Sequence, residues 1–216
     1  MARESLSRDR VLAAAIRVAD RGGVEAISMR RVAQELNVEA MSLYHHVPNK
    51  DAILDGVVDA VFVLIDLPPA GCADWRDAIR ARAGAAREVL SHHSWALGLM
   101  DSRRNPGPAT LRHHNAVLGV LRQAGFSVAL AVHAVSLIDS YIYGFVLQEA
   151  SLPADDMQQM AGEIAEHADA LPHLKEVAEH TQKAGYSPAD DFRFGLDLIL
   201  DALEDRRSVA CARGDD

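Results

Sequence analysis

The chain has 216 residues, of which 49% are hydrophobic and 25% are charged. These proportions are ordinary for a globular protein and exclude an intrinsically disordered chain. Aromatic residues make up only 5%, and the many alanines and leucines favour helix over sheet. Two widely separated cysteines and the absence of an apolar run in residues 1–10 predict a cytoplasmic protein without a secretory signal.

The formal net charge of −9 would repel a nucleic acid, but the charge is unevenly distributed. Residues 1–50 carry eight Lys or Arg against six Asp or Glu, whereas residues 51–216 carry 14 against 25. A polyanion is repelled by the second part and tolerated by the first. Any contact with DNA is therefore expected near the N-terminus.

Four helices are predicted before residue 67, over 7–21, 28–37, 39–47 and 49–66. Ser7, Ser28 and Asn49 precede apolar-periodic segments and are expected to be N-caps. Gly22-Gly23 ends the first helix, and Pro48 forbids continuation of the third.

The rest of the chain also reads as helical, over 75–91, 94–100, 110–123, 127–148, two weaker stretches between 155 and 184, and 188–206. Segment 127–148 is almost continuously apolar and long enough to span a membrane. It lacks basic flanks, and Asp139 would cost about 3 kcal/mol at the bilayer centre. We therefore expect a helix buried on several sides in a bundle, no membrane contact, and an all-α fold.

Residues 28–47 fit a helix-turn-helix. This motif needs a small residue where its helices cross and a permissive residue in the turn, and Ala33 and Asn37 meet these needs. The second helix would expose Ala40, Met41, Ser42, Tyr44, His45 and His46. Such side chains can contact thymine methyls, base edges and phosphates, and Lys50 adds a charge at the next helix N-terminus. The pattern alone fits an ordinary helical hairpin equally well.

Two segments carry a family resemblance: Gly-Gly-Val-Glu-Ala-Ile-Ser-Met-Arg-Arg-Val-Ala-Gln-Glu-Leu-Asn-Val at 22–38 and Leu-Tyr-His-His-Val-Pro-Asn-Lys at 43–50. They resemble the DNA-binding domain of the tetracycline-repressor (TetR) family, and the likeness extends over 6–63. It implies operator contacts at Ser28, Met29, Arg30, Ala40, Met41, Ser42, Tyr44, His45, His46 and Lys50. Ala40 and His45 stand where the tetracycline repressor has glutamine and tryptophan, so its operator sequence does not transfer.

A weaker likeness continues into the second part of the chain, at Val89-Leu90-Ser91-His92, Gly125-Phe126-Ser127 and Gly144-Phe145-Val146-Leu147. These segments look like the tetracycline-repressor class. The resemblance implies a three-helix DNA-binding domain at 1–48, a connecting helix at 49–66, and a regulatory and dimerisation domain at 67–216. It also implies a homodimer through helices near 127–149 and 188–205, with recognition helices about 34–36 Å apart on double-stranded DNA.

Regulators of this class release DNA when a small molecule binds the helical core. The resemblance implies a pocket near Trp95, Met100, His114, Val117, Leu118, Val135, Asp139 and Gln148. The residues that form the tetracycline–magnesium site in this class are replaced in this sequence. Arg82, Ala86 and Val117 occupy the positions of an asparagine, a phenylalanine and a glutamine, respectively. Leu99 or Met100 occupies the position of the metal-binding histidine, and Gln148 occupies that of a carboxylate. We therefore expect no metal, no cofactor and an inducer other than tetracycline.

Two other functions fit parts of the sequence. A DNA-binding activator or architectural factor that needs no ligand would carry the same motif. A metal-dependent enzyme is suggested by ten histidines, but those in the doublets at 45–46, 92–93 and 113–114 point about 100° apart on a helix. His-Glu-x-x-His spacing, phosphate loops and nucleophile elbows are absent from the sequence. We expect a non-enzymatic repressor, released from a palindromic operator by an unidentified small molecule.

Overall fold

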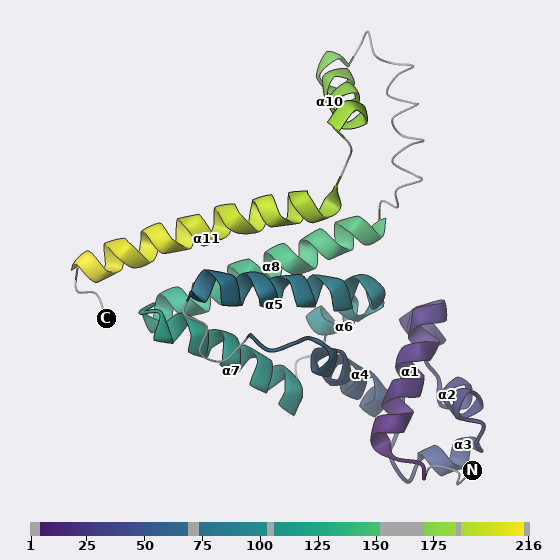
Figure 1. The fold of residues 1–216 in the computed structure, drawn as a ribbon. Coiled ribbons are helices and arrows are strands. Elements are labelled where there is room, and N and C mark those ends of the chain that lie inside the picture. The colour runs from purple at the N-terminus through teal and green to yellow at the C-terminus, as the bar shows by residue number, and fades with distance from the viewer. Residues whose placement is uncertain (1–4, 69–73, 103–105, 152–170, 185–186, 214–216) are drawn as a thin grey trace.

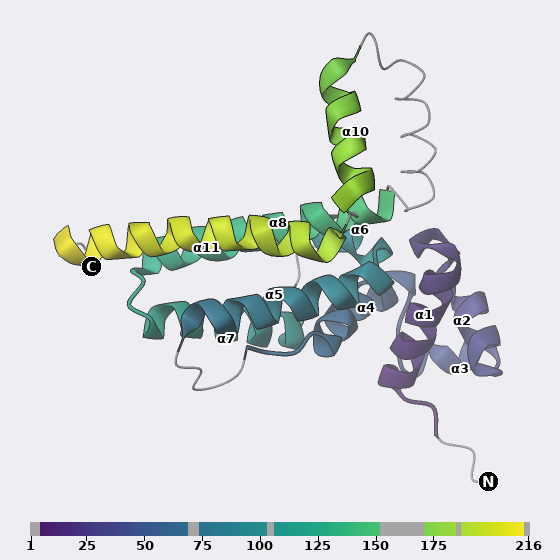
Figure 2. The same cartoon turned by 45° about the horizontal axis from the view of Figure 1, so that its top comes forward.

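The computed structural model describes residues 5–68, 74–102, 106–151, 171–184 and 187–213, and the regular elements in these ranges are all helices (Figure 1). A small N-terminal group lies at one end, formed by α1 (Arg8–Gly22), the 3-10 turn η1 (Val24–Ala26), α2 (Met29–Leu36) and α3 (Ala40–Leu43). Helix α4 (Lys50–Leu64) leads into a larger body of α5 (Trp75–His92), α6 (Trp95–Ser102), α7 (Pro108–Gln123), α8 (Val128–Ser151) and α11 (Pro188–Arg213). Helix α10 (Pro172–Ala184) projects from this body (Figure 2).

The predicted helix starts in the N-terminal group are confirmed. The Ser7 hydroxyl accepts a hydrogen bond from the backbone N–H of Arg10 (3.3 Å), and the Ser28 hydroxyl accepts one from that of Arg31 (3.2 Å). The side-chain oxygen of Asn49 accepts a hydrogen bond from the backbone N–H of Ala52 (2.8 Å). Each cap satisfies one of the N–H groups that a first helical turn leaves without an intrahelical partner.

Two helices end at different residues from those that the sequence predicted. Helix α3 closes at Leu43 instead of reaching Val47, because the chain tightens into a turn in which the N–H of His46 donates to Leu43 O (2.8 Å) ahead of the proline. Helix α11 continues to Arg213 instead of ending near residue 206, because residues 207–213 contain no Gly or Pro to end it. Of the two weaker stretches predicted between 155 and 184, the part over 155–170 lies outside the described residues, and the other part is α10.

The hydrophobic core has two parts, and α4 belongs to both. Ile53 and Val57 pack with residues of α1, α2 and α3 in the N-terminal core. One turn later, Val61 and Phe62 pack in the core of the larger body. Leu99 of α6 also reaches the N-terminal core. The two parts of the molecule are therefore joined by packed side chains from α4 and α6.

Helix α8 is apolar all round, and by length and composition alone it could cross a membrane. It packs on α5, α7 and α11 through one face only, so the expected burial on several sides is not met within one chain. The outer face exposes Val128 and Val132, each more than half accessible. Asp139, the charged residue near the middle of α8, is 9% exposed and ion-paired. In one chain, α8 thus presents an uncovered apolar surface.

The turn of the helix-turn-helix gives a stability test. Asn37 has φ 53° and ψ 48°, the left-handed region that the sequence predicted for it. A β-branched residue is strained there and glycine is not. We expect the Asn37→Val variant to be less stable than Asn37→Gly by about 1–2 kcal/mol in urea unfolding. Equal stability of the two variants would contradict a strained turn.

Candidate DNA-binding surface and ligand-binding cavity

Helices α2 and α3 are held at a fixed angle by the turn between them. The left-handed Asn37 reverses the chain, and the N–H of Val38 donates to Ala33 O (3.0 Å). Ala33 is buried where the helices meet. Leu43 and Val47 enter the N-terminal core, so that the opposite side of α3 and its following turn faces outward.

Four of the ten predicted DNA-contacting residues are exposed, three of them on α3 and its following turn. Met41 is 74% and Tyr44 is 47% exposed, and Arg30 and His45 are exposed as well. The remaining members are half-buried: Ser28, Met29, Ala40, Ser42, His46 and Lys50. Lys50 begins α4 directly after the Asn49 cap, beside backbone N–H groups that favour an anion.

Helix α2 is tied to α1 by a carboxylate shared between two arginines. Arg17 Nε donates to Glu35 Oε1 (2.8 Å), and Arg21 donates to Oε2. The hydrogen bonds from Arg17 and then Arg21 lower the pKa of Glu35. This clamp joins α1 to α2 and uses no side chain of α3.

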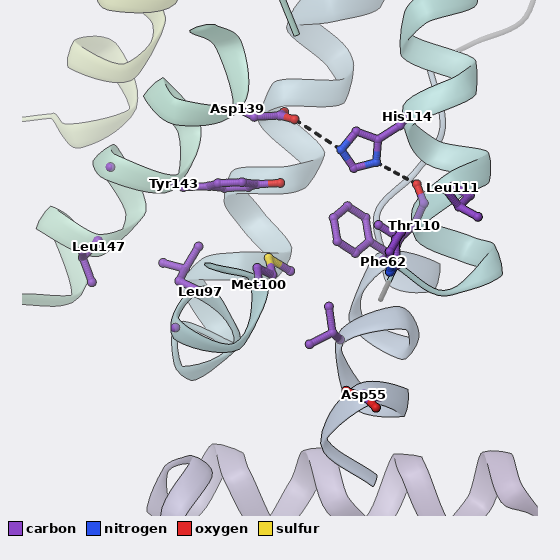
Figure 3. Close-up of a pocket in the computed structure, with 14 residues that line it drawn as sticks. Asp55, Phe62, Leu97, Met100, Thr110, Leu111, His114, Asp139, Tyr143 and Leu147 are labelled. Carbon is purple, nitrogen blue, oxygen red and sulfur yellow. Dashed lines mark hydrogen bonds and ion pairs between the residues drawn. The ribbon is translucent and has the colours of Figure 1, made fainter. Parts of the chain in front are cut away.

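A cavity of about 800 Å³ lies between α4, α6, α7 and α8 in the larger body (Figure 3). Most of its wall is apolar, and the polar side chains gather where α7 faces α8. Its lining residues are Asp55, Val58, Phe62, Leu97, Gly98, Met100, Pro106, Thr110, Leu111, His114, Asp139, Tyr143, Gly144 and Leu147.

Three of the eight predicted pocket residues line this cavity: Met100, His114 and Asp139. The cavity lies at the open end of the α7–α8 hairpin, where α8 contributes Asp139, Tyr143 and Leu147 on successive turns. Leu118 and Val135 share the helix faces of His114 and Asp139 but sit one turn closer to the hairpin connection, beyond the cavity.

The other predicted pocket residues have different surroundings. Val117 is 2% exposed in the core, on the same face of α7 as His113. Gln148 is exposed to solvent. Trp95 faces the N-terminal group, where its indole N–H donates to Asp20 Oδ1 (2.8 Å).

The sequence prediction missed the contribution of α4, from which Asp55, Val58 and Phe62 enter the cavity wall. Their spacing of three and four residues places them on one helix face, a signal that was readable. From the sequence, this helix was assigned only a connecting role. The missed lining of α8, at Tyr143 and Leu147, continues the face of Asp139.

A buried arginine lies at the polar end of the hydrophobic core of the larger body. Arg82 of α5 is 2% exposed; its Nη1 lies 2.6 Å from Asp139 Oδ1, and its Nε donates to His113 Nε2 (2.8 Å). Burial, and then the positive charge of Arg82, lowers the pKa of His113 to about 4, so its imidazole is neutral near pH 7. Arg82 and Asp139 thus compensate each other's charge, and His113 accepts a further hydrogen bond from the guanidinium.

Tyr143 lies one turn along α8 from Asp139, with its hydroxyl directed into the cavity (Figure 3). Burial, followed by the nearby Asp139 carboxylate, raises the pKa of Tyr143 to about 12, against the opposing effect of Arg82. The hydroxyl therefore stays protonated at neutral pH and can both donate and accept.

Two connections join the cavity wall to the DNA-binding end. Asp20, near the end of α1, bonds through Oδ1 to His93 Nδ1 (2.7 Å) and accepts from Trp95 Nε1 (2.8 Å) at the start of α6. Helix α6 then contributes Leu97 and Met100 to the cavity. Helix α4 is the second connection, because it begins at Lys50 and lines the cavity farther along.

Helix α4 is also anchored to α7 beside the cavity. Asp59 Oδ1 accepts from the N–H and the hydroxyl of Thr110 (2.8 and 3.0 Å), and Oδ2 accepts from the N–H of Ala109 (3.2 Å). The carboxylate caps the positive N-terminus of α7. Gly107 is required nearby, since a Cβ there would lie 2.3 Å from Asp59 Cγ.

Comparisons with known proteins identify the family. Residues 11–57 match the model of the bacterial regulatory proteins of the tetR family, and residues 67–207 match the tetracyclin repressor-like C-terminal domain. The chain belongs to the TetR family. An HTH-type transcriptional regulator of Saccharopolyspora erythraea is 36% identical over 86% of this chain and 76% of its own. The HTH-type transcriptional repressor DrrR1 of Streptomyces coeruleorubidus is 32% identical over 93% and 78% of the two chains.

Solved structures agree with this assignment. The TetR family protein ActR of Streptomyces coelicolor in complex with actinorhodin superposes with a TM-score of 0.78 at 25% identity, covering 93% of this chain and 96% of ActR. The expected all-α fold with an N-terminal helix-turn-helix is confirmed. The protein is a TetR-family transcriptional regulator, a class that does not consist of enzymes.

In this TetR-family regulator, the positions that correspond to the tetracycline–magnesium site carry side chains of a different chemical type. Arg82, where asparagine was expected, is engaged with Asp139 and His113, and Ala86 is fully buried. Among the described residues, His, Cys, Asp and Glu form no group of three that could hold a metal ion.

The buried His113 gives a pH test of this cluster. Between pH 6.5 and about 4 the unfolded state binds a proton at this residue that the folded state does not, so stability falls as pH is lowered through that range. The expected loss is on the order of 2–3 kcal/mol. Urea unfolding of His113→Gln, which retains an acceptor for Arg82, should show a flatter pH dependence. His173→Gln, at an exposed position of α10, should follow the wild type.

Proposed function

We propose that this regulator is a repressor that binds a palindromic operator as a homodimer and leaves it when a small molecule occupies the α4–α6–α7–α8 cavity. The observation that carries the proposal is the sharing of α4 and α6. Both helices line the cavity, and both pack into the core of the helix-turn-helix. A ligand that favours one arrangement of these helices then favours one placement of the DNA-binding surface.

The proposed DNA contacts are those inferred from the sequence. Phosphates would be bound by Tyr44, His46 and Lys50. Base edges in the major groove would be contacted by Ala40, Met41 and His45. Ser28, Met29, Arg30 and Ser42 complete the surface. The outward exposure of Met41 and Tyr44 and the positive end of α4 beside Lys50 support this assignment.

A homodimer is supported by the uncovered apolar faces of α8 and α11. Phe194 and Leu198 of α11 are 68% and 55% exposed at a spacing of four residues, and α8, which packs on α11, exposes Val132. Large apolar side chains gathered on two packed helices are typical of an interface. We infer that a second copy of the chain covers these apolar faces and that they do not contact lipid. We also infer that the protein works in the cytoplasm without a metal or cofactor.

A footprint on the DNA that flanks the protein's own gene tests DNA recognition. We expect a protected palindrome with the wild type and loss of protection, by at least about tenfold in affinity, with Tyr44→Ala, since an exposed phosphate-gripping side chain is removed. Val177→Ala, at an exposed site on α10, is the control and should protect like the wild type. Unchanged affinity of a folded Tyr44→Ala dimer would count against the proposed surface. Adding candidate ligands to the same footprint tests release.

The dimer interface is tested by placing a charge in it. Leu198→Arg would bury guanidinium groups against an apolar partner, so we expect a monomer in analytical ultracentrifugation and weakened operator binding. Val63→Arg, on α4 at a position 66% exposed, is the matched control and should stay dimeric. A dimeric Leu198→Arg protein would show that the second copy docks elsewhere.

A further inference from the structure

A polar hollow of about 590 Å³ lies between the end of α2 and the start of α3. Its lining residues are Gln34, Asn37, Val38, Glu39 and Ser42. Ser42 belongs to the proposed DNA contacts, whereas Gln34 and Glu39 do not. In a helix-turn-helix, the N-terminal residues of the second helix meet the base edges of the major groove. The hollow therefore lies where this protein would read a base pair.

Glu39 brings an open carboxylate to the hollow. It lies directly before α3, is exposed, and makes no capping hydrogen bond with its side chain. In the part of the chain that the structure describes, its carboxylate also has no ion pair. Glu35, the other acidic residue of the helix-turn-helix, differs because Arg17 and Arg21 both bind it. Glu39 is therefore an acceptor that remains available to a donor from outside the protein.

The first turn of α3 offers few other hydrogen-bonding groups. Ala40 and Met41 can make only apolar contacts with a base, for example with a thymine methyl group. Gln34 and Ser42 bring an amide and a hydroxyl to the hollow, and each of these can donate or accept. The Glu39 carboxylate can only accept. Hydrogen-bonded discrimination between bases at this end of α3 therefore depends most on Glu39.

A carboxylate in this position distinguishes between the groups that the major groove presents. It repels phosphate oxygens and the acceptors of guanine and thymine, and only the amino groups of cytosine and adenine can donate to it. Adenine presents its N6 donor beside the N7 acceptor, an arrangement that suits an amide, whereas cytosine presents N4 as a donor that suits a carboxylate. The guanine paired with that cytosine presents two acceptors, which fit donors from Gln34 and Ser42.

We propose that Glu39 is a specificity-determining residue that accepts a hydrogen bond from the N4 amino group of one cytosine in each operator half-site. Gln34 and Ser42, in the same hollow, are placed to donate to the paired guanine. This inference rests on the proposed operator binding through α3. Glu39 acts against other sequences as well, because its carboxylate then faces an acceptor without a donor between them.

Selection of binding sites from a pool of random DNA duplexes tests this inference with the full-length protein and requires no known operator. We expect the wild type to enrich a palindrome with cytosine at one symmetry-related pair of positions. Replacing this C·G pair by T·A in one half-site should weaken binding about tenfold in fluorescence anisotropy, as loss of one base contact implies.

Two variants and one control connect the cytosine preference to Glu39. Glu39→Ala should reduce the cost of the same replacement to within about threefold and leave the preferences at other positions intact. Glu39→Gln should change the preferred base from cytosine to adenine, because an amide pairs with N6 and N7 of adenine. Glu25→Gln, at an exposed site in η1, removes the same charge from the N-terminal group and should keep the cytosine preference.

The inference is overturned if both Glu39 variants enrich the wild-type sequence with unchanged preferences, or if the base whose preference they lose is not cytosine. It is also overturned if Glu25→Gln loses the cytosine preference, since charge alone would then explain the effect. An enriched palindrome with unchanged preferences would count against Glu39 alone and leave the proposed operator binding standing. Absence of any enriched sequence with the wild type would instead contradict the proposed operator binding, and the inference with it.

Discussion

The structure depends on one helix that belongs to two cores. The first half of α4 is buried against α1, α2 and α3, and its second half against the larger body. Fifteen residues of helix form a rod of about 22 Å that cannot bend without losing its own hydrogen bonds or its packing. Lys50 stands at one end of this rod and Phe62 near the other. A displacement of the cavity wall is therefore a displacement of the DNA-binding surface.

The buried Arg82–Asp139 pair is the unusual feature of an otherwise apolar body. Moving both charges out of water costs several kcal/mol per ion, and well-packed apolar residues of similar volume often serve stability as well or better. Stability alone does not account for the pair. The pair also fixes the position of the Asp139 carboxylate, because Arg82 binds one of its oxygens and leaves the other facing His114 and the cavity. Asp139 on α8 is thereby fixed relative to α5, while one acceptor stays available.

The sequence could predict those parts of the fold that local rules determine. Ser28 and Asn37 sit in conformations that their own side chains and backbone preferences favour, so cap and turn were recoverable without tertiary information. Composition and helical periodicity predicted the all-α class, and the family resemblance decided between a helix-turn-helix and an ordinary helical hairpin. The predicted pocket shares Met100, His114 and Asp139 with the cavity but also included Leu118 and Val135, one turn beyond it, because the cavity's position depends on how the helices pack, which periodicity does not encode. Trp95 illustrates this best, since its partner, Asp20, is 75 residues earlier in the chain.

Asp20 links α1 to the segment that leads into α6. A single carboxylate on α1 binds His93 at the end of α5 and Trp95 at the start of α6, and α6 enters the cavity within one turn. Hydrogen bonds of this kind are lost when donor and acceptor separate by well under 1 Å beyond their normal distance. Helix α4, in contrast, is held to α7 by three hydrogen bonds to Asp59 and resists such a shift at that point. In the proposed release, a ligand in the cavity would act between the three hydrogen bonds of Asp59 to α7 and the two bonds of Asp20 to His93 and Trp95. It can change operator affinity only by the difference in its own binding free energy between the two arrangements. The contacts that α6 makes with the ligand and with α1 are consequently the ones that must differ between them.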